Sequence, residues 1–375
     1  MADVAIVGAG LIGAGIAYEL AKRGATVTVF DRDEPARAAS WAGAGMLAPF
    51  SEELPDPAML ALCRASLEMY PAFVEELRES SGVDAKLVPC GTLHVALDDA
   101  SFAALRSIAP VFRANGGDVQ LLDRTEIFER EAALTRTVAG GLFVANEAQV
   151  DNRRLGRALV AACERRGVRF ERCAELSIEA DARRVRGVNT SRGFVPVGAV
   201  VNAAGAWAGA VAGVPPSARI PVIPVAGEML AIAVPRSFAR ALIWLGHTYL
   251  VPRGDGRLLV GATVAERGFD ARVSAHGVHV LLDAALKAIP ALAEFALVET
   301  WAGLRPGTPD KRPFLGATPI DGYFVAAGHY RNGILLTPIT ARALAETIAT
   351  GQTDVDLDAF GQARVEPGTA LAAAN

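Results

Sequence analysis

The segment "VAIVGAGLIGAGIAYELAKRGATVTVFD", residues 4–31, decides the fold of this chain. Its first four residues, 4–7, are apolar and predict a short, buried parallel strand. Three glycines follow with the spacing G-x-G-x-x-G: Gly8, Gly10 and Gly13. Apolar residues then recur at helical intervals, and a second strand over 26–30 ends in Asp31. This order, in which a strand is followed by a glycine turn, a helix, a second strand and an acid, predicts a dinucleotide-binding unit.

Each part of this unit has a physical reason. Gly8 permits a tight turn, Gly10 lets the backbone approach a pyrophosphate, and Gly13 lets the helix press onto the strand. The N-terminus of the helix favours an anion because its first amide groups have no partner within the helix. Asp31 can accept hydrogen bonds from both ribose hydroxyls of an adenosine, and its charge would repel the 2′-phosphate of NADP.

FAD and NAD both fit this fingerprint, and the next segment helps to choose between them. Residues 39–49, "ASWAGAGMLAP", are small and offer further backbone amides for a second phosphate or a ribityl chain. An NAD dehydrogenase would usually continue with another strand–helix unit. This chain turns irregular instead and then predicts a helix over 57–80, which favours FAD.

The remaining strand–helix units lie near 150–208 and at the C-terminus, and mostly strand-like segments lie between them. This order predicts an α/β fold with a discontinuous Rossmann-like FAD-binding domain and a mostly antiparallel β-sheet substrate domain with flanking helices. The expected FAD-binding parts are 1–85, 141–219 and 301–364. The expected substrate-domain parts are 86–140 and 220–300, and a flexible tail is expected over 365–375.

Composition excludes several classes of function. The chain has 375 residues with a net charge of −4, and its basic residues are scattered, which argues against nucleic-acid binding. The apolar stretch 198–214 consists mainly of Gly and Ala and is short for a membrane span. No signal peptide is visible and no C-x-x-C pair occurs, so a cytoplasmic protein without membrane contact is expected. His276 and His279 have no obvious partner nearby, so no metal site is predicted.

A candidate anchor for a substrate lies in "WAGLRPGTPDKRPFLG", residues 301–316. Arg305 stands between Gly-Leu and Pro-Gly in a stretch that is otherwise apolar or turn-forming, so we expect it in a fixed turn. A guanidinium held in this way binds a carboxylate or phosphate in bidentate fashion. The alternative is a structural ion pair that braces the turn.

Several longer segments together resemble a known family. They include "VDNRRL", "VVNAAGAWA", "YLVPRGDGRLLVGAT", "WAGLRPGTPDKRPFLG" and "AAGHYRNGILLTPIT". With the N-terminal fingerprint they resemble the FAD-dependent D-amino-acid oxidase superfamily from about residue 3 to 350, and within it the glycine oxidase branch of thiamine biosynthesis. The segments "WAGLRPGTPD" and "GHYRNGILL" are specific to this branch, whereas "VVNAAG"-like segments occur across the superfamily.

The resemblance implies roles for individual residues. Arg305 matches the group that binds the substrate carboxylate, and Tyr249 matches a second substrate contact. Arg331 lies beside the expected flavin loop and contacts either the substrate or only this cofactor loop. Expected contacts of non-covalent FAD are Gly8, Gly10, Gly13, Asp31, Arg32, Ser40, Gly45, Met46, Leu47, Glu175, Gly205, His329, Tyr330, Arg331, Asn332, Gly333, Ile334 and Leu335. Val264 departs from the branch, which can carry a larger Met there, so the size of the pocket stays open.

The implied activity is oxidative deamination of glycine, and by the same resemblance of sarcosine or small D-amino acids, with O2 giving H2O2. Hydride transfer from Cα of a neutral amine to flavin N5 needs alignment and no acid or base. The N-terminus of a helix expected over 334–350 would face the ring edge where charge develops. The resemblance also implies a homo-oligomer, often a tetramer. A D-amino-acid dehydrogenase with a quinone or protein acceptor, and a non-catalytic nucleotide-binding subunit, remain alternatives.

Overall fold

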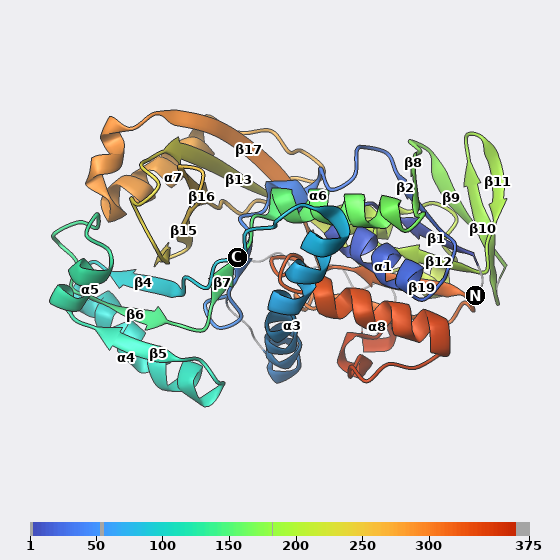
Figure 1. Ribbon diagram of the computed structural model, residues 1–375, viewed down its shortest axis with the longest axis horizontal. Coiled ribbons are helices and arrows are strands. Elements are labelled where there is room, and N and C mark those ends of the chain that lie inside the picture. Colours follow the sequence, from blue (N-terminus) through green and yellow to red (C-terminus); the bar gives the residue numbers. More distant parts are fainter. Residues whose placement is uncertain (1–2, 53–55, 182, 365–375) are drawn as a thin grey trace.

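Two large sheets organise the chain in the computed structural model, which describes residues 3–52, 56–181 and 183–364. Figure 1 shows the two sheets toward opposite ends of an elongated molecule, with α3 (Pro57–Ser81) between them. The flexible tail predicted over 365–375 lies outside the described residues.

The first sheet has six strands in the order β18-β19-β12-β1-β2-β8. All neighbours are parallel except β18 and β19. The strands are β1 (Val4–Val7), β2 (Val27–Asp31), β8 (Arg169–Arg172), β12 (Ala199–Asn202), β18 (Phe314–Ala317) and β19 (Tyr323–Ala327). Every residue of the central strand β1 is buried, as its short apolar run predicts.

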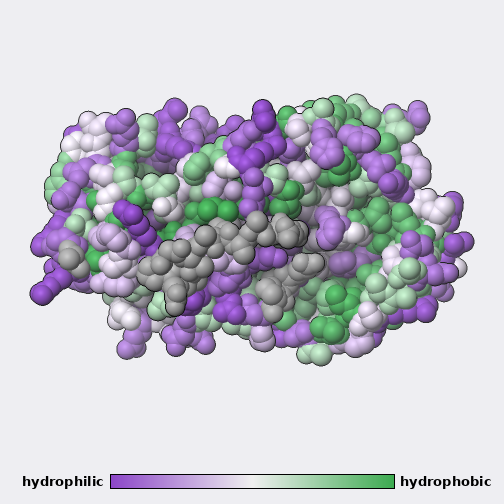
Figure 2. All heavy atoms as spheres, turned by 180° about the vertical axis from the view of Figure 1, so that it is seen from behind, coloured by the Kyte–Doolittle hydropathy of each residue, from purple (hydrophilic) through white to green (hydrophobic). Residues whose placement is uncertain are grey.

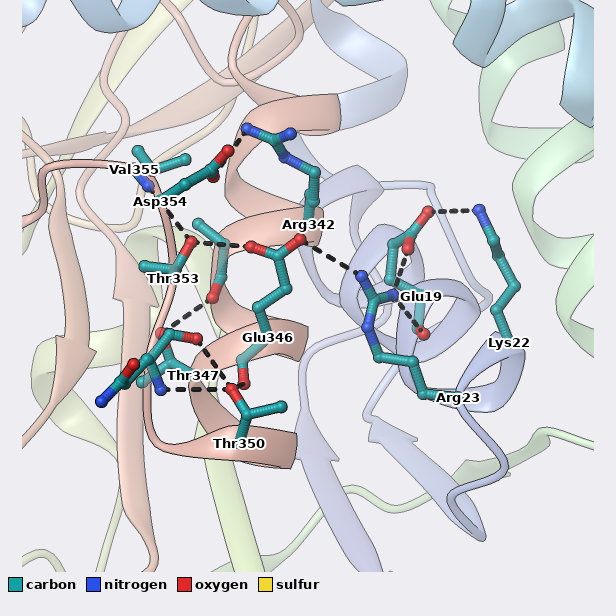
Figure 3. A network of polar contacts seen from close by, with 12 residues as sticks. Glu19, Lys22, Arg23, Arg342, Glu346, Thr347, Thr350, Thr353, Asp354 and Val355 are labelled. Atoms are coloured by element: carbon teal, nitrogen blue, oxygen red, sulfur yellow. Dashed lines mark hydrogen bonds and ion pairs between the residues drawn. The ribbon is translucent and has the colours of Figure 1, made fainter.

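Three helices pack around this sheet: α1 (Leu11–Lys22), α6 (Asn152–Arg165) and α8 (Thr337–Thr350). The helices α1 and α8 approach closely at Gly15, which has no side chain. A Cβ there would lie only 3.1 Å from the Cβ of Ala341. Figure 3 shows the polar network beside this contact, in which Arg23 bonds to the Glu19 backbone oxygen at 2.9 Å and reaches Glu346 at 3.4 Å. The network ties the C-terminal end of α1 to α8.

The second sheet has eight strands in the order β17-β13-β16-β15-β14-β4-β6-β5. All neighbours are antiparallel except β14 and β4. Its strands are β4 (Thr92–Ala96), β5 (Val119–Leu122), β6 (Gly140–Val144), β13 (Ile223–Ala233), β14 (Leu242–Leu245), β15 (Thr248–Pro252), β16 (Arg257–Gly261) and β17 (Leu297–Gly307). Three helices accompany it: α4 (Asp99–Ala114), α5 (Arg124–Arg130) and α7 (Ala275–Ala288). The predicted fold class, a parallel Rossmann-like sheet plus a mostly antiparallel sheet with flanking helices, is confirmed.

Smaller elements complete the fold. A three-stranded antiparallel sheet and a two-stranded sheet are present in addition to the short helix α2 (Ala39–Ala42). Their strands are β3 (Met46–Leu47), β7 (Ala148–Gln149), β9 (Leu176–Ala180), β10 (Val185–Thr190) and β11 (Gly193–Pro196). Among the described residues, no helix combines the length and apolar character that crossing a membrane requires.

Two of the expected domain boundaries meet continuous strands. The boundary at 140/141 falls within β6, and the boundary at 300/301 falls within β17. Arg305 therefore does not lie in a turn, as its Gly and Pro neighbours suggest, but near the end of an eleven-residue strand. Pairing with β13 along its whole length holds this segment extended, and Pro306 lies near the end of an edge strand, where proline is tolerated.

Candidate active site

The glycine turn after β1 forms the floor of a long cavity. Gly8 has φ of +107°, a conformation that favours glycine. A Cβ at Gly13 would lie 1.9 Å from the Gly8 carbonyl oxygen, so only glycine lets α1 start this close to β1. Gly10 lines the cavity itself, where a Cβ would meet the Ser40 hydroxyl at 3.2 Å. The three glycines thus bring bare backbone to the start of α1.

Asp31 and Arg32 lie at one end of the cavity, together with Glu175 and Gly205. One Asp31 oxygen, Oδ2, accepts from the Ala9 amide at 2.7 Å, and Oδ1 accepts from the Asp33 amide at 3.0 Å. The carboxylate is thereby fixed in the cavity wall and keeps lone pairs for a further donor. The Arg32 guanidinium lies 3.6 Å from the ring centre of Trp207.

The segment from α2 to β3 forms one side of the cavity. The Ser40 hydroxyl accepts from the Leu11 amide at 2.9 Å and so joins α2 to the first turn of α1. Gly45 has φ of +70°, and Gly45 and Met46 both line the cavity. Leu47 does not: its side chain is fully buried in the core beneath the six-stranded sheet. Side chains alternate along β3, so Leu47 faces away when Met46 faces in.

The loop between β19 and α8 also lines the cavity and packs against the segment after α2, where a Cβ at Gly43 would lie 2.7 Å from the Ile334 side chain. His329, Tyr330, Arg331, Asn332, Gly333 and Ile334 all line it, whereas the Leu335 side chain is buried in the core. His329 contacts the Thr340 hydroxyl at 3.2 Å, and burial lowers the pKa of its imidazole to about 3. His329 is therefore neutral at pH 7. The helix α8 begins at Thr337 rather than at residue 334.

These surfaces test whether the chain can hold FAD. A pocket at the Asp31 end and a pocket at the Arg305 end adjoin, because Gly10, Ser40 and Gly205 line both. Within the described part of the chain, the amides of Ile12 and Ile334 have no hydrogen-bond acceptor, and both residues line the cavity. A long anionic ligand with many oxygens can accept hydrogen bonds from these two amides, so the residues present fit FAD.

Arg305 and Tyr249 lie at the other end of the cavity. The Arg305 Nη1 donates to the Thr263 carbonyl oxygen at 3.1 Å and approaches the Ala226 carbonyl oxygen at 3.4 Å. Among the described residues, no carboxylate lies within ion-pair distance of Arg305. Burial raises the pKa of the Tyr249 hydroxyl, and the positive charges of Arg305 and Arg331 oppose this rise. Both cations therefore act on the same hydroxyl.

The sequence analysis did not identify two residues that line the candidate site. Gly227 lines the cavity beside Arg305, and a Cβ there would lie 2.3 Å from the guanidinium, so glycine makes room for the arginine. Glu52 also lines the cavity, with its Oε2 2.8 Å from the Nε of Arg331. Glu52 follows the small-residue segment 39–49 in sequence, but no spacing rule singles it out.

Val264, where the sequence leaves the size of the pocket open, lies outside the cavity. Its side chain is 56% exposed, and the cavity wall beside Arg305 is formed by Met229, Tyr249 and Leu304 instead. Among the described residues, no three His, Cys, Asp or Glu side chains are grouped to hold a metal ion.

A parallel nucleotide-binding sheet and a cavity that leads from its glycine turn to an arginine define a dinucleotide-dependent oxidoreductase. A family model described as FAD dependent oxidoreductase, DAO, matches residues 3–347. The chain belongs to this family, and the prediction of FAD as its cofactor is confirmed.

Individual relatives agree with the family. The chain is 37% identical to glycine oxidase of Geobacillus kaustophilus (strain HTA426) over 366 residues, which cover 96% of this chain and 97% of that protein. A crystal structure of glycine oxidase from Geobacillus kaustophilus matches with a TM-score of 0.92 and covers 97% of this chain and 99% of that one. The resemblance to glycine oxidases is thereby confirmed.

A second kind of relative is longer than this chain. The bifunctional protein ThiO/ThiG of Trichormus variabilis (strain ATCC 29413 / PCC 7937) is 36% identical over 373 residues. The match covers 97% of this chain and 55% of that protein, so the chain spans about half the length of this relative.

Proposed function

We propose that this chain is an FAD-dependent amine oxidase that oxidatively deaminates glycine, with O2 as electron acceptor and H2O2 as product. One observation carries the proposal: a half-buried guanidinium, Arg305, lines the cavity and has no carboxylate partner among the described residues. A small amino acid supplies that carboxylate. The glycine oxidase of Geobacillus kaustophilus supports glycine as the substrate, and sarcosine and small D-amino acids belong to the same proposal.

The residues of the cavity would act by positioning. Arg305 would bind both oxygens of the substrate carboxylate in one plane, and the Tyr249 hydroxyl would donate a further hydrogen bond. The ring of Tyr249 is held in place by Trp244, which packs against it with ring centres 5.5 Å apart. The chemistry that bound FAD supplies is the acceptance of a hydride from the substrate Cα. His329, which is neutral and buried against Thr340, is assigned no proton transfer.

The proposed cofactor contacts follow the cavity. The adenosine would be held near Asp31, Arg32 and Glu175, and the pyrophosphate at the glycine turn and Ser40. The loop 329–334 and residues 45–46 would hold the flavin. We also retain a role in thiazole and thiamine biosynthesis, which is supported by the names of the ThiO/ThiG relatives.

The substitution Arg305→Ala tests the proposal in the flavin-loaded enzyme. Two charge-assisted hydrogen bonds of ~2 kcal/mol each are lost, so kcat/KM for glycine should fall about a thousandfold while FAD stays bound. Arg305→Lys should recover little, because an ammonium group cannot make the bidentate contact. Anaerobic bleaching of the flavin by glycine and peroxide release in air give the two readouts.

Arg236→Ala is the matched control, because Arg236 is exposed on the loop after β13. Full glycine turnover in Arg305→Ala would show that another group anchors the substrate. Bleaching by glycine without peroxide in air would favour the dehydrogenase alternative, and no bleaching in the unaltered protein would favour the non-catalytic one.

A further inference from the structure

Glu52 brings a negative charge into the cavity that otherwise presents two arginines. It follows β3 by five residues, and its residue surface is only 8% exposed. Its Oε2 lies 2.8 Å from Arg331 Nε, and both residues line the same cavity as Arg305 and Tyr249. A carboxylate is rarely buried without a function or a partner, and Arg331 provides the partner.

The charges of three groups converge on one hydroxyl. Burial raises the pKa of Tyr249; the positive charges of Arg305 and Arg331 lower it, and the negative charge of Glu52 raises it further. All three groups line the same pocket as Tyr249. The pocket thus presents a cation for a carboxylate, Arg305, and also an anion, Glu52.

The backbone that carries Glu52 is fixed from below. Glu147, which lies between β6 and β7, accepts hydrogen bonds from the Phe50 amide at 2.8 Å and the Ser51 amide at 2.9 Å. The Ser51 hydroxyl donates to the other Glu147 oxygen at 2.5 Å, and the Glu52 amide donates to the Ala48 carbonyl oxygen at 3.2 Å. These buried bonds fix the backbone that carries Glu52 at the wall of the cavity, and the ion pair with Arg331 holds its side chain there.

We propose that Glu52 binds the amino group of the substrate while Arg305 binds its carboxylate. This inference rests on the proposed function and deepens it, because it assigns the second end of the amino acid. An ammonium group, or the N–H groups of a neutral amine, would share the Glu52 carboxylate with Arg331. The enzyme would then select amino acids over carboxylic acids of the same size, because only amino acids add an N–H donor to this carboxylate.

The experiment compares two ligands that differ by the amino group. Acetate binding to the flavin-loaded enzyme is followed by the change in flavin absorbance, and the apparent Kd of glycine is taken from anaerobic flavin bleaching. In Glu52→Gln, the loss of a charge-assisted contact should raise the apparent Kd of glycine about tenfold or more. The Kd of acetate should stay unchanged or decrease, because a negative charge has left an anion-binding cavity.

Two further variants keep the test decisive. Glu68→Gln removes the same charge from an exposed position on α3 and should alter neither ligand. Glu52→Asp keeps the charge that pairs with Arg331, and its glycine Kd should lie between those of the unaltered enzyme and Glu52→Gln. If Glu52→Gln loses its flavin, the Asp variant alone decides by the ratio of the two Kd values.

The outcomes separate the two proposals. If the Kd values of glycine and acetate rise by the same factor in Glu52→Gln, Glu52 only positions Arg331 and this inference is overturned, while glycine oxidation stands. If glycine fails to bleach the unaltered enzyme, the proposed function itself fails.

Discussion

At the scale of single residues, this protein shows how a glycine makes room for a functional side chain. The guanidinium of Arg305 occupies the space that a Cβ at Gly227 would need, on the neighbouring strand β13. Gly13 instead makes room for backbone, because a Cβ there would meet the Gly8 carbonyl oxygen of the glycine turn. The chain therefore places small residues where cofactor and substrate are proposed to bind, and their spacing is only in part visible in sequence.

The most consequential buried acid is Glu147. Burial raises the pKa of its carboxyl from 4.5 to about 6. The protonated form is therefore favoured by folding, and this contribution to stability is present below pH 4.5 and lost as the pH rises through 6. A shift of this size corresponds to roughly 2 kcal/mol. His94 acts in the opposite sense, because burial lowers its pKa to about 4, so its contribution is lost as the pH falls from 6.5 to 4.

Glu147→Gln separates these opposing effects. Glutamine can still accept hydrogen bonds from the Phe50 and Ser51 amides but does not ionise. The free energy of unfolding of the variant, minus that of the unaltered protein, should rise by roughly 2 kcal/mol between pH 4.5 and pH 7. Urea unfolding followed by circular dichroism at the two pH values measures this difference. A difference that stays constant would show that Glu147 is not the group that titrates.

At the scale of elements, the two sheets are joined by a clamp between α6 and β17. Arg153 of α6 forms a bidentate pair with Glu299 of β17, with N–O distances of 3.0 and 2.9 Å. Its guanidinium also lies 3.6 Å from the ring centre of Trp41 in α2. The two charged side chains are 20% and 29% exposed, so the pair is weaker than a buried one and the stacking adds to it.

We expect Arg153→Lys to cost about 1 kcal/mol of unfolding free energy and Arg153→Ala about 1–2 kcal/mol. Lysine loses the bidentate geometry and the planar contact with Trp41 although it keeps the charge. The midpoint of urea unfolding gives the measurement, and Arg157→Lys, an exposed position on the same helix, gives the control. Equal midpoints for Arg153→Lys and the unaltered protein would leave the clamp with no energetic role.

At the scale of the whole molecule, the cavity lies between the two sheets. Its walls come from α1, α2 and the loop before α8 on one side and from β13, β15 and β17 on the other. A ligand that binds only the folded chain stabilises it by about 2.7 kcal/mol at a hundredfold excess over its Kd. FAD added to the apoprotein should therefore raise its Tm by several degrees.

ADP offers a sharper version of this measurement. It carries the adenosine and pyrophosphate but lacks the flavin, so it should engage the Asp31 end alone and raise the Tm less than FAD does. Thermal scans at matched ligand concentrations give the comparison. If ADP and FAD raised the Tm equally, the walls formed by β13, β15 and β17 would contribute nothing to cofactor binding.

The surface of the molecule does not test whether the chain forms the expected homo-oligomer. Figure 2 shows hydrophobic areas scattered between hydrophilic ones on one face of the molecule. Large apolar side chains such as Val264 and Phe269 are half exposed. The expected homo-oligomer and the cytoplasmic location both remain predictions, as do the expected FAD-binding parts 1–85, 141–219 and 301–364 and the substrate-domain parts 86–140 and 220–300.

The sequence by itself determined the nucleotide-binding unit, the cofactor class and the identity of the arginine proposed as the anchor. These follow from local rules, because a glycine turn, its helix and the acid after the next strand lie within 28 residues of each other. Only the tertiary structure decided that Arg305 lies on a strand, that Leu47 and Leu335 face the core, and that Glu52 meets Arg331. These depend on contacts between distant segments: Glu147, for example, holds the Phe50 amide across 97 positions, and no local pattern encodes such a pairing.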